Sequence, residues 1–208
     1  ISIKAILCAR GGYGTVQIID SIDFTNLKTK SKWIVGYSDV TVLHSHLNNL
    51  GIASLHATMP INFETNTKES LDSLKATLFG NKNYIECGVN FFNRIGKVEA
   101  ETVGGNLSIL YSLLGSVSDI DTDGKILFIE DLDEYLYHID RMLMNLKRNN
   151  KFTKLKGLIV GGMSDMNDNE ISFGKTAEEI ILEHTKDYEF PICFGFPAGH
   201  LTDNRCVR

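Results

Sequence analysis

Short apolar runs alternate along the chain with segments in which apolar residues recur every three or four positions. The runs predict buried strands, and the periodic segments predict amphipathic helices. The predicted strands cover residues 3–9, 33–35, 52–55, 125–129, 158–160 and 192–196. Because strands and helices alternate, the pattern favours an α/β fold in which most strands are parallel.

Each predicted helix carries one apolar stripe. The stripe residues are Val16, Ile18 and Ile19; Val40, Leu43, Leu47 and Leu50; Leu107, Leu110, Leu113 and Leu114; Leu136, Ile139, Leu143 and Leu146; and Ala177, Ile180 and Ile181. Gly51 and Gly115 are expected to end the second and third helices. Residues 62–79 are polar and amphipathic, and residues 80–93 give weak signals of short strands or a connection. We therefore expect a domain boundary near residues 85–97.

Composition narrows the class of partner. The chain has 208 residues, 43% hydrophobic and 23% charged, which is typical of a globular protein with one or two domains. A formal charge of −5 with scattered basic residues argues against nucleic acid or an anionic membrane surface as the main partner. No run approaches the roughly 20 apolar residues of a membrane span. Small molecules and peptides remain as possible ligands. Because the chain begins at Ile1, inside a predicted strand, and stops at Arg208, just after a candidate site, we expect a fragment that lacks both true termini.

The cysteines encode no recognisable metal or redox motif. Cys8, Cys87, Cys193 and Cys206 are far apart and form no C-x-x-C pair, which argues against a zinc ribbon. Cys8 and Cys193 lie in strand-like runs and are interpreted as small core residues. Reduced thiols in a cytoplasmic protein are the simplest interpretation.

A candidate nucleophile lies at the end of the second predicted strand. In the sequence Gly36-Tyr37-Ser38-Asp39 the serine occupies a sharp turn from strand to helix, where a hydroxyl projects out of the fold. Gly36 relieves crowding in such a turn, and the following helix start favours negative charge near Ser38. Val40 stands where the pattern G-x-S-x-G has its last glycine, so a helix-capping serine remains an alternative.

Other candidate site residues follow predicted strands. In parallel α/β folds ligands bind beyond the carboxyl ends of the strands, and these ends carry residues 10–12, Ser38, residues 130–131 and residues 199–200. Ser38, Glu130 and His200 form a possible triad in the chain order of the α/β-hydrolases. His200 would take the proton of Ser38, and Glu130 would orient the imidazole.

Several residues have competing interpretations. Asp131 and Glu134 compete with Glu130 for the acid role, although Glu134 suits a solvent-facing position at the next helix start. Asn106 follows two glycines before a helix and is either a cap or a substrate contact. Residues 10–14 form either a tight turn or a phosphate cradle, but neither G-x-G-x-x-G nor a Walker lysine is present.

The remaining histidines suggest no metal site. His44 and His46 are two residues apart on a predicted helix, so their side chains diverge, and we expect surface or interface positions. For His56, His138 and His184 we expect structural or solvated roles, because the sequence identifies no partner.

Five motifs together resemble the L,D-carboxypeptidase family of serine peptidases. They are residues 9–14, 36–39 and 104–107, residues 129–131 through 139–143, and residues 199–200, in the family's order. The family includes muramoyltetrapeptide carboxypeptidases and microcin-immunity peptidases. The resemblance extends from Ile3 to Asn204.

The resemblance implies a two-domain fold with the active site between the domains. A flavodoxin-like N-terminal domain, residues 1–90, would carry Ser38 and lack the family's first strand and helix. A smaller α/β domain, residues 91–208, partly barrel-like and cut short at its C-terminus, would carry Glu130 and His200. Asn204 matches the family's asparagine four residues after the histidine.

The resemblance also implies an activity. Family members release the terminal D-alanine of a murein tetrapeptide in cytoplasmic cell-wall recycling, as homodimers, with no metal or other cofactor. The backbone N–H groups of Gly12 and Asp39 are candidate oxyanion donors, and Gly11 and Gly12 would let the backbone come close. Arg10 or a helix N-terminus is a candidate partner for the substrate's free carboxylate.

Two other functions remain open. The chain could be a microcin-immunity peptidase that cleaves aminoacyl-nucleotide conjugates. It could instead be a noncatalytic ligand-binding module, although Ser38, Glu130 and His200 together argue against this class.

Overall fold

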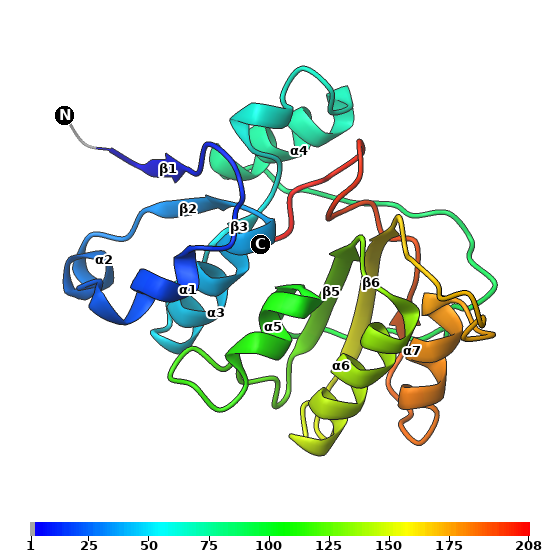
Figure 1. Cartoon of the computed structure of the whole chain (residues 1–208). Coiled ribbons are helices and arrows are strands. Elements are labelled where there is room, and N and C mark those ends of the chain that lie inside the picture. The colour runs from blue at the N-terminus through cyan, green and yellow to red at the C-terminus, as the bar shows by residue number, and fades with distance from the viewer. Residues whose placement is uncertain (1–2) are drawn as a thin grey trace.

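The computed structural model describes residues 3–208 as two parallel β-sheets flanked by helices (Figure 1). The first sheet has the order β1 (Ala5–Leu7), β2 (Trp33–Gly36), β3 (Leu55–His56). The second has the order β4 (Thr102–Asn106), β5 (Ile126–Leu132), β6 (Gly157–Ser164), β7 (Ile192–Cys193). Every paired neighbour is parallel, which confirms the predicted α/β class. Ile1, where we expected the chain to begin within a strand, lies outside the described residues.

Helices connect the strands in both halves. The first half contains α1 (Thr15–Ile18), α2 (Thr25–Thr29), α3 (Thr41–Asn49) and α4 (Lys68–Leu78). The second contains α5 (Leu107–Leu113), α6 (Leu136–Arg148) and α7 (Ala177–Thr185). Short 3-10 turns lie at η1 (Ile19–Ser21), η2 (Ser38–Val40) and η3 (Pro60–Asn62).

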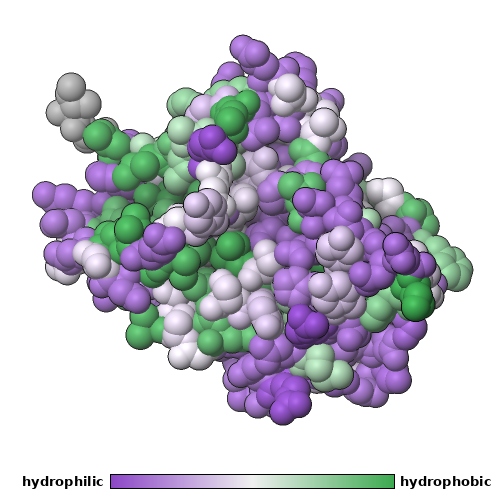
Figure 2. Space-filling model, viewed as in Figure 1, coloured by the Kyte–Doolittle hydropathy of each residue, from purple (hydrophilic) through white to green (hydrophobic). Residues whose placement is uncertain are grey.

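Alternation along β2 gives this strand of the first sheet two covered faces, whereas Ile6 and Leu7 of β1 are exposed, contrary to the buried strand predicted there. Ile34 packs in a cluster with residues of η1 and α3, whereas its neighbour Val35 packs in another cluster with Leu74 of α4. Figure 1 shows α1 to α3 on one side of this sheet and α4 on the other. Apolar side chains also gather on the surface over β1 and α1, where Ile6 and Val16 are exposed (Figure 2).

The second sheet holds the largest core. The predicted stripe of α6 is confirmed in part, because Ile139, Leu143 and Leu146 are buried against the sheet together with Met142. Burying one such side chain contributes roughly 1.5–3 kcal/mol. The helices α5, α6 and α7 lie together on one face of the sheet (Figure 1). Among the described residues the sheet is open, with β4 and β7 as its outer strands, and does not close into a barrel.

Helix α3 joins the two sheets by packing on β4 and α5. The backbone N–H of Asn106 donates to Thr41 Oγ1 at 3.0 Å. A Cβ on Gly105 would lie 2.5 Å from the same oxygen, so only glycine permits this approach. The contact fixes the position of β4 relative to the turn that carries Ser38.

Three elements differ from the predicted ones. Residues 102–106 form β4, a strand that was not predicted, and their glycines precede the expected helix, α5. The third predicted strand is shorter and shifted to Leu55–His56, and α2 was not predicted. Residues 80–93 form a connection, as one of the two interpretations held, and they contain no strand.

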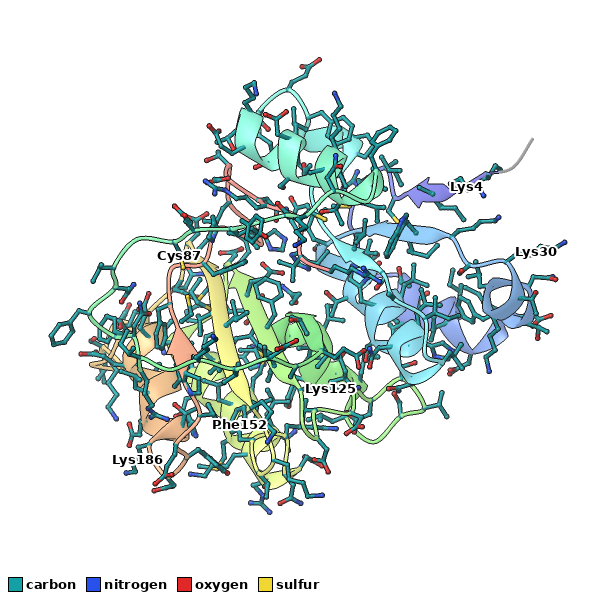
Figure 3. The ribbon with its side chains drawn as sticks, turned by 180° about the vertical axis from the view of Figure 1, so that it is seen from behind. Lys4, Lys30, Cys87, Lys125, Phe152 and Lys186 are labelled. Carbon is teal, nitrogen blue, oxygen red and sulfur yellow. The ribbon has the colours of Figure 1, made fainter. Side chains whose placement is uncertain are left out.

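Segment 79–101 leads from the first half to the second and passes the outer edge of β7. Arg94 and Ile192 form an isolated antiparallel bridge there. Figure 3, seen from behind, shows this segment crossing the molecule with Cys87 on it. The predicted boundary at residues 85–97 falls within this segment and stays a prediction. Across residues 3–208, none of the helices combines the length and apolarity that crossing a bilayer requires.

Candidate active site

Ser38 lies in a strained turn directly after β2. Its φ is +63°, a conformation that costs a non-glycine residue of order 1–3 kcal/mol and that recurs at functional sites. A Cβ on Gly36 would lie 2.8 Å from Val40 Cγ2, which explains the glycine two residues earlier. This is the geometry of a strand-to-helix turn that displays a nucleophile.

The alternative role of Ser38 as a cap is not seen. Tyr37 precedes η2 and Val40 precedes α3, and neither helix start receives a side-chain cap. Within the described part of the chain, the Ser38 hydroxyl makes no hydrogen bond, and its residue is half-buried. The hydroxyl is therefore available to a ligand.

Glu130 and His200 form a buried pair supplied by the second half. Glu130 is 0% exposed at the end of β5, and its Oε2 accepts hydrogen bonds from His200 Nδ1 at 2.6 Å and from the His200 backbone N–H at 3.1 Å. A Cβ on Gly199, whose φ is +105°, would lie 2.7 Å from Glu130 Oε2, so glycine is required beside the carboxylate. Asn204 Oδ1 accepts from the Gly199 N–H at 2.9 Å and holds this turn.

The pair changes the protonation of the histidine. Burial lowers the pKa of His200, but the hydrogen bond that His200 donates to Glu130 and the negative charge of Glu130, with a further contribution from Asp131, raise the pKa above the usual 6.5. Since Nδ1 faces Glu130, Nε2 is the nitrogen left to exchange a proton with a ligand.

A pocket of about 240 Å³ brings both halves together. It is lined by Arg10, Gly11, Gly12, Tyr37, Ser38, Met59, Ile61, Asn62 and His200. The Tyr37 ring packs edge-on against His200 with centroids 4.9 Å apart, and its hydroxyl donates to Asn62 Oδ1 at 3.1 Å. Burial, followed by the charge of Glu130, raises the pKa of Tyr37, so this hydroxyl keeps its proton. No hydrogen bond joins Ser38 to His200 among residues 3–208.

The other two candidate acids have different partners. Asp131 accepts from Asn106 Nδ2 and from the Ser108 backbone N–H, both at 2.9 Å, at the start of α5. Burial, and the charge of Glu130, raise the pKa of Asp131 to about 7. Glu134 pairs with His138 Nδ1 at 2.6 Å. Of the three acids, the structure brings only Glu130 to His200.

Asn106 caps α5, as one of its two interpretations held. Its Oδ1 accepts from the Ile109 backbone N–H at 3.1 Å, its Nδ2 donates to Asp131, and the residue is 5% exposed. The structure does not bring Asn106 to the pocket that Ser38 lines.

The glycine turn, residues 10–14, lies against Ser38. A Cβ on Gly11 would lie 3.0 Å from Ser38 Cβ and 3.1 Å from its Oγ, and one on Gly12 would lie 3.6 Å from Asp39 Oδ2. That oxygen accepts from the backbone N–H and the hydroxyl of Thr15, at 3.1 and 2.7 Å. The Asp39 side chain thus joins the start of α1, just after the glycine turn, to the turn that carries Ser38. Arg10 is exposed at the rim.

The expected surface or interface position is wrong for His44. This residue is 6% exposed, with Nδ1 2.8 Å from Ser54 Oγ and Nε2 2.9 Å from the Gly36 carbonyl oxygen. Burial lowers its pKa to about 4, so it is neutral. The contact with the Gly36 carbonyl oxygen explains why His44 is buried, because it supports the backbone just before Ser38. No sequence pattern indicates this contact.

His46, His138 and His184 each have a partner in the structure. His46 is half-buried with Nδ1 2.9 Å from Ser118 Oγ, and His184 Nε2 lies 2.8 Å from Asp140 Oδ1. The structural interpretation of His138 and His184 therefore fits the structure.

His56 is buried under the pocket between the Tyr37 and Phe128 rings, at centroid distances of 5.9 and 4.8 Å. Burial, with the nearby His44 and His200, holds its pKa well below 6.5. It fills space as a neutral ring.

Within residues 3–208, no three His, Cys, Asp or Glu side chains gather closely enough to hold a metal ion. Cys8 is half-buried at the edge of an apolar cluster, and Cys193 is half-buried rather than fully inside the core.

Comparisons with known proteins agree across both halves. Residues 1–57 match the model of the LD-carboxypeptidase N-terminal domain, and residues 99–208 match that of the LD-carboxypeptidase C-terminal domain. A Bacillus subtilis protein named "Probable murein peptide carboxypeptidase" is 34% identical over 99% of this chain. The chain spans 66% of that relative's length.

Two further proteins show similarity over nearly the whole chain. The crystal structure of muramoyltetrapeptide carboxypeptidase from Oxalobacter formigenes is 27% identical, with a TM-score of 0.86 over 99% of this chain and 72% of its own. The microcin C7 self-immunity protein MccF of Escherichia coli is 25% identical over 95% of this chain and 67% of its own length.

Proposed function

This chain belongs to the LD-carboxypeptidase family, and we therefore propose that it is a serine L,D-carboxypeptidase that releases the terminal D-alanine of murein tetrapeptides. The observation that carries the proposal is the pocket that Ser38 shares with His200, whose imidazole is held by the buried carboxylate of Glu130. Its volume of about 240 Å³ is below the usual range of ligand pockets, roughly 300–1,000 Å³.

In the proposed mechanism, Ser38 Oγ attacks the carbonyl carbon between the L-configured diamino-acid centre and D-alanine. His200 takes the Ser38 proton at Nε2 and delivers it to the leaving amine, while Glu130 stabilises the imidazolium cation. Water then hydrolyses the acyl-enzyme, with His200 as the base. Because the pKa of His200 is raised, its neutral form increases as pH rises above 6.5.

Backbone and basic groups complete the proposed site. The N–H groups of Gly12 and Asp39 would donate to the oxyanion, since the glycine turn lies against Ser38 and Asp39 follows it. Exposed Arg10, at the rim of the pocket, would bind the free carboxylate of D-alanine. An arginine at this place favours a chain end and thus an exopeptidase.

The biological setting proposed here rests on the family. We place the activity in cytoplasmic cell-wall recycling and expect a homodimer that needs no metal or other cofactor.

The test is D-alanine release from L-Ala-γ-D-Glu-meso-diaminopimelyl-D-Ala and from its lysine counterpart, with and without a chelator. Ser38→Ala keeps the Cβ, and therefore the strain of the turn, while it removes the hydroxyl. We expect release to fall by at least about 10⁴-fold, as for other nucleophile deletions. Ser112→Ala, on the exposed side of α5, is the matched control. Release that survives Ser38→Ala would disprove the catalytic role.

A second candidate is the cleavage of aminoacyl-nucleotide conjugates, which the similarity to the microcin C7 self-immunity protein supports. The same panel extended with an aminoacyl sulfamoyl nucleoside separates the two activities. Serine-dependent cleavage of that compound without D-alanine release would favour the second.

A further inference from the structure

Two cysteines that are distant in sequence lie side by side behind the second sheet. Cys87 belongs to segment 79–101, where Figure 3 labels it, and Cys193 ends β7. Both are free thiols, and their Sγ atoms are 3.2 Å apart. We propose that a hydroperoxide oxidises this pair to a reversible disulfide, which locks segment 79–101 to β7.

Backbone hydrogen bonds next to Cys193 hold segment 79–101 against β7. Arg94 N donates to the Ile192 carbonyl oxygen at 3.0 Å, and Ile192 N donates to the Arg94 carbonyl oxygen at 2.9 Å. Asn93 Oδ1 accepts from the Phe194 N–H at 2.7 Å. These bonds hold the segment beside β7. The sulfurs therefore need to approach by only about 1.1 Å to reach the usual S–S length of about 2.05 Å.

The two thiols differ in a way that gives the reaction an order. Cys87 is exposed, whereas Cys193 is half-buried. Burial, together with the hydrogen bond to Cys87 and the charge of its thiolate, raises the pKa of Cys193 to about 12. Cys193 therefore keeps its proton, and the exposed Cys87 sulfur is the first to react.

The steps balance with one hydroperoxide. With hydrogen peroxide as the hydroperoxide, the Cys87 thiolate attacks one peroxide oxygen, the O–O bond breaks, and Cys87 becomes a sulfenic acid while hydroxide leaves and takes a proton from solvent to form water. The Cys193 sulfur then attacks the Cys87 sulfur. The S–S bond forms, the S–O bond breaks, and the oxygen departs as a second water with the Cys193 proton. Two thiols lose two electrons, and the peroxide gains them.

The bond would secure a part of segment 79–101 whose side chains are exposed. Tyr84, Val89 and Phe91 of segment 79–101 are exposed, on both sides of Cys87. The cross-link joins residues 106 positions apart, a long loop whose closure restricts the unfolded chain. The segment should accordingly become harder to cleave by protease.

The experiment treats the purified protein with one equivalent of hydrogen peroxide and follows intact mass, non-reducing peptide maps and thermal unfolding. We expect a monomer lighter by about 2 Da, the loss of two hydrogens. The map should contain one peptide pair that joins Cys87 to Cys193, and dithiothreitol should reverse the change. The Tm should rise by about 4–16 °C, and cleavage within segment 79–101 should slow.

Cysteine variants provide the controls. Cys8→Ser should retain the cross-link, and Cys87→Ser and Cys193→Ser should each abolish it. Because Cys87 is exposed, reduced Cys87→Ser should keep the wild-type Tm, which verifies its folding. Sulfinic or sulfonic acid at Cys87 without a cross-link, or dimers joined through Cys87, would overturn the proposed pairing. A cross-linked monomer with unchanged Tm and unchanged cleavage would overturn the locking.

Discussion

Replacing Glu130 by glutamine removes a negative charge beside His200 and keeps the size of the side chain. In the native protein, Oε2 of this fully buried residue accepts two hydrogen bonds from His200, at 2.6 and 3.1 Å. Burial lowers the pKa of His200, and Glu130 raises it to above 6.5. In Glu130→Gln burial remains without the carboxylate, so we expect the pKa of His200 to fall below 6.5.

This change has a defined effect on stability. A histidine whose folded pKa is raised stabilises the protein below the unfolded pKa, near 6.5, and this contribution is lost as pH rises through the folded pKa. In the variant, the lowered pKa instead destabilises the protein as pH falls. The free energy of unfolding of the wild type should therefore increase relative to that of Glu130→Gln as pH falls from about 8 to about 5. The gain is about 1.4 kcal/mol for each unit that separates the two folded pKa values.

The assay combines an NMR titration of His200, urea unfolding at several pH values and D-alanine release. We expect release to fall by about 10⁴-fold, as when a triad acid is replaced by its amide. Glu134→Gln is the matched control, since Glu134 makes a similar bond to His138 at 2.6 Å. It should leave His200 and D-alanine release unchanged. A His200 pKa in Glu130→Gln that equals or exceeds the wild-type value would refute the reasoning.

Two further substitutions test the surroundings of the pair. Gly199→Ala should cost about 2 kcal/mol or more in stability, because its Cβ would lie 2.7 Å from Glu130 atoms at a φ of +105°. Gly124→Ala is the control, because Gly124 has a φ of +71° and an added Cβ would have no atom within 4 Å. This variant measures the cost of the backbone conformation alone. Equal urea midpoints for the two variants would contradict the prediction. Burial and the charge of Glu130 raise the pKa of Asp131 to about 7, so its contribution to stability falls as pH rises from about 4 to about 7. Asp131→Asn should remove this fall, and parallel stability curves for variant and wild type would count against it.

The hydrophobic pattern predicted most strands and helices but missed β4. Gly104 and Gly105 favour a turn when only the sequence is known. In the structure a Cβ on Gly104 would lie 1.9 Å from the Phe128 carbonyl oxygen, and one on Gly105 would lie 2.5 Å from Thr41 Oγ1. Glycine is therefore needed at both positions because the backbone of β4 passes close to Phe128 and Thr41. Both of these residues are distant in sequence.

The candidate site could be predicted in part from the sequence, because the carboxyl ends of parallel strands lie at the same edge of a sheet. Ser38, Glu130 and His200 follow from that rule, but the choice between Glu130 and Asp131 does not. Neighbouring residues of a strand point to opposite faces, and only the observed partners show which face carries His200.

The remaining features that the sequence did not predict depend on contacts between distant segments. His44 was placed on the surface because its buried partner, the Gly36 carbonyl, belongs to another element. Cys87 and Cys193 showed no pairing because 106 positions separate them. Local periodicity contains no information about either contact.

The packing of α3 on β4 also bears on how the protein is made. Ser38 is synthesised before His200, and Asn106 reaches Thr41 only when the second sheet docks. A growing chain therefore holds a strained serine without its base. Under the proposed mechanism, the protein becomes able to hydrolyse peptides only when the second half docks on the first. Chains that have not reached this stage cannot cleave peptides in the cell.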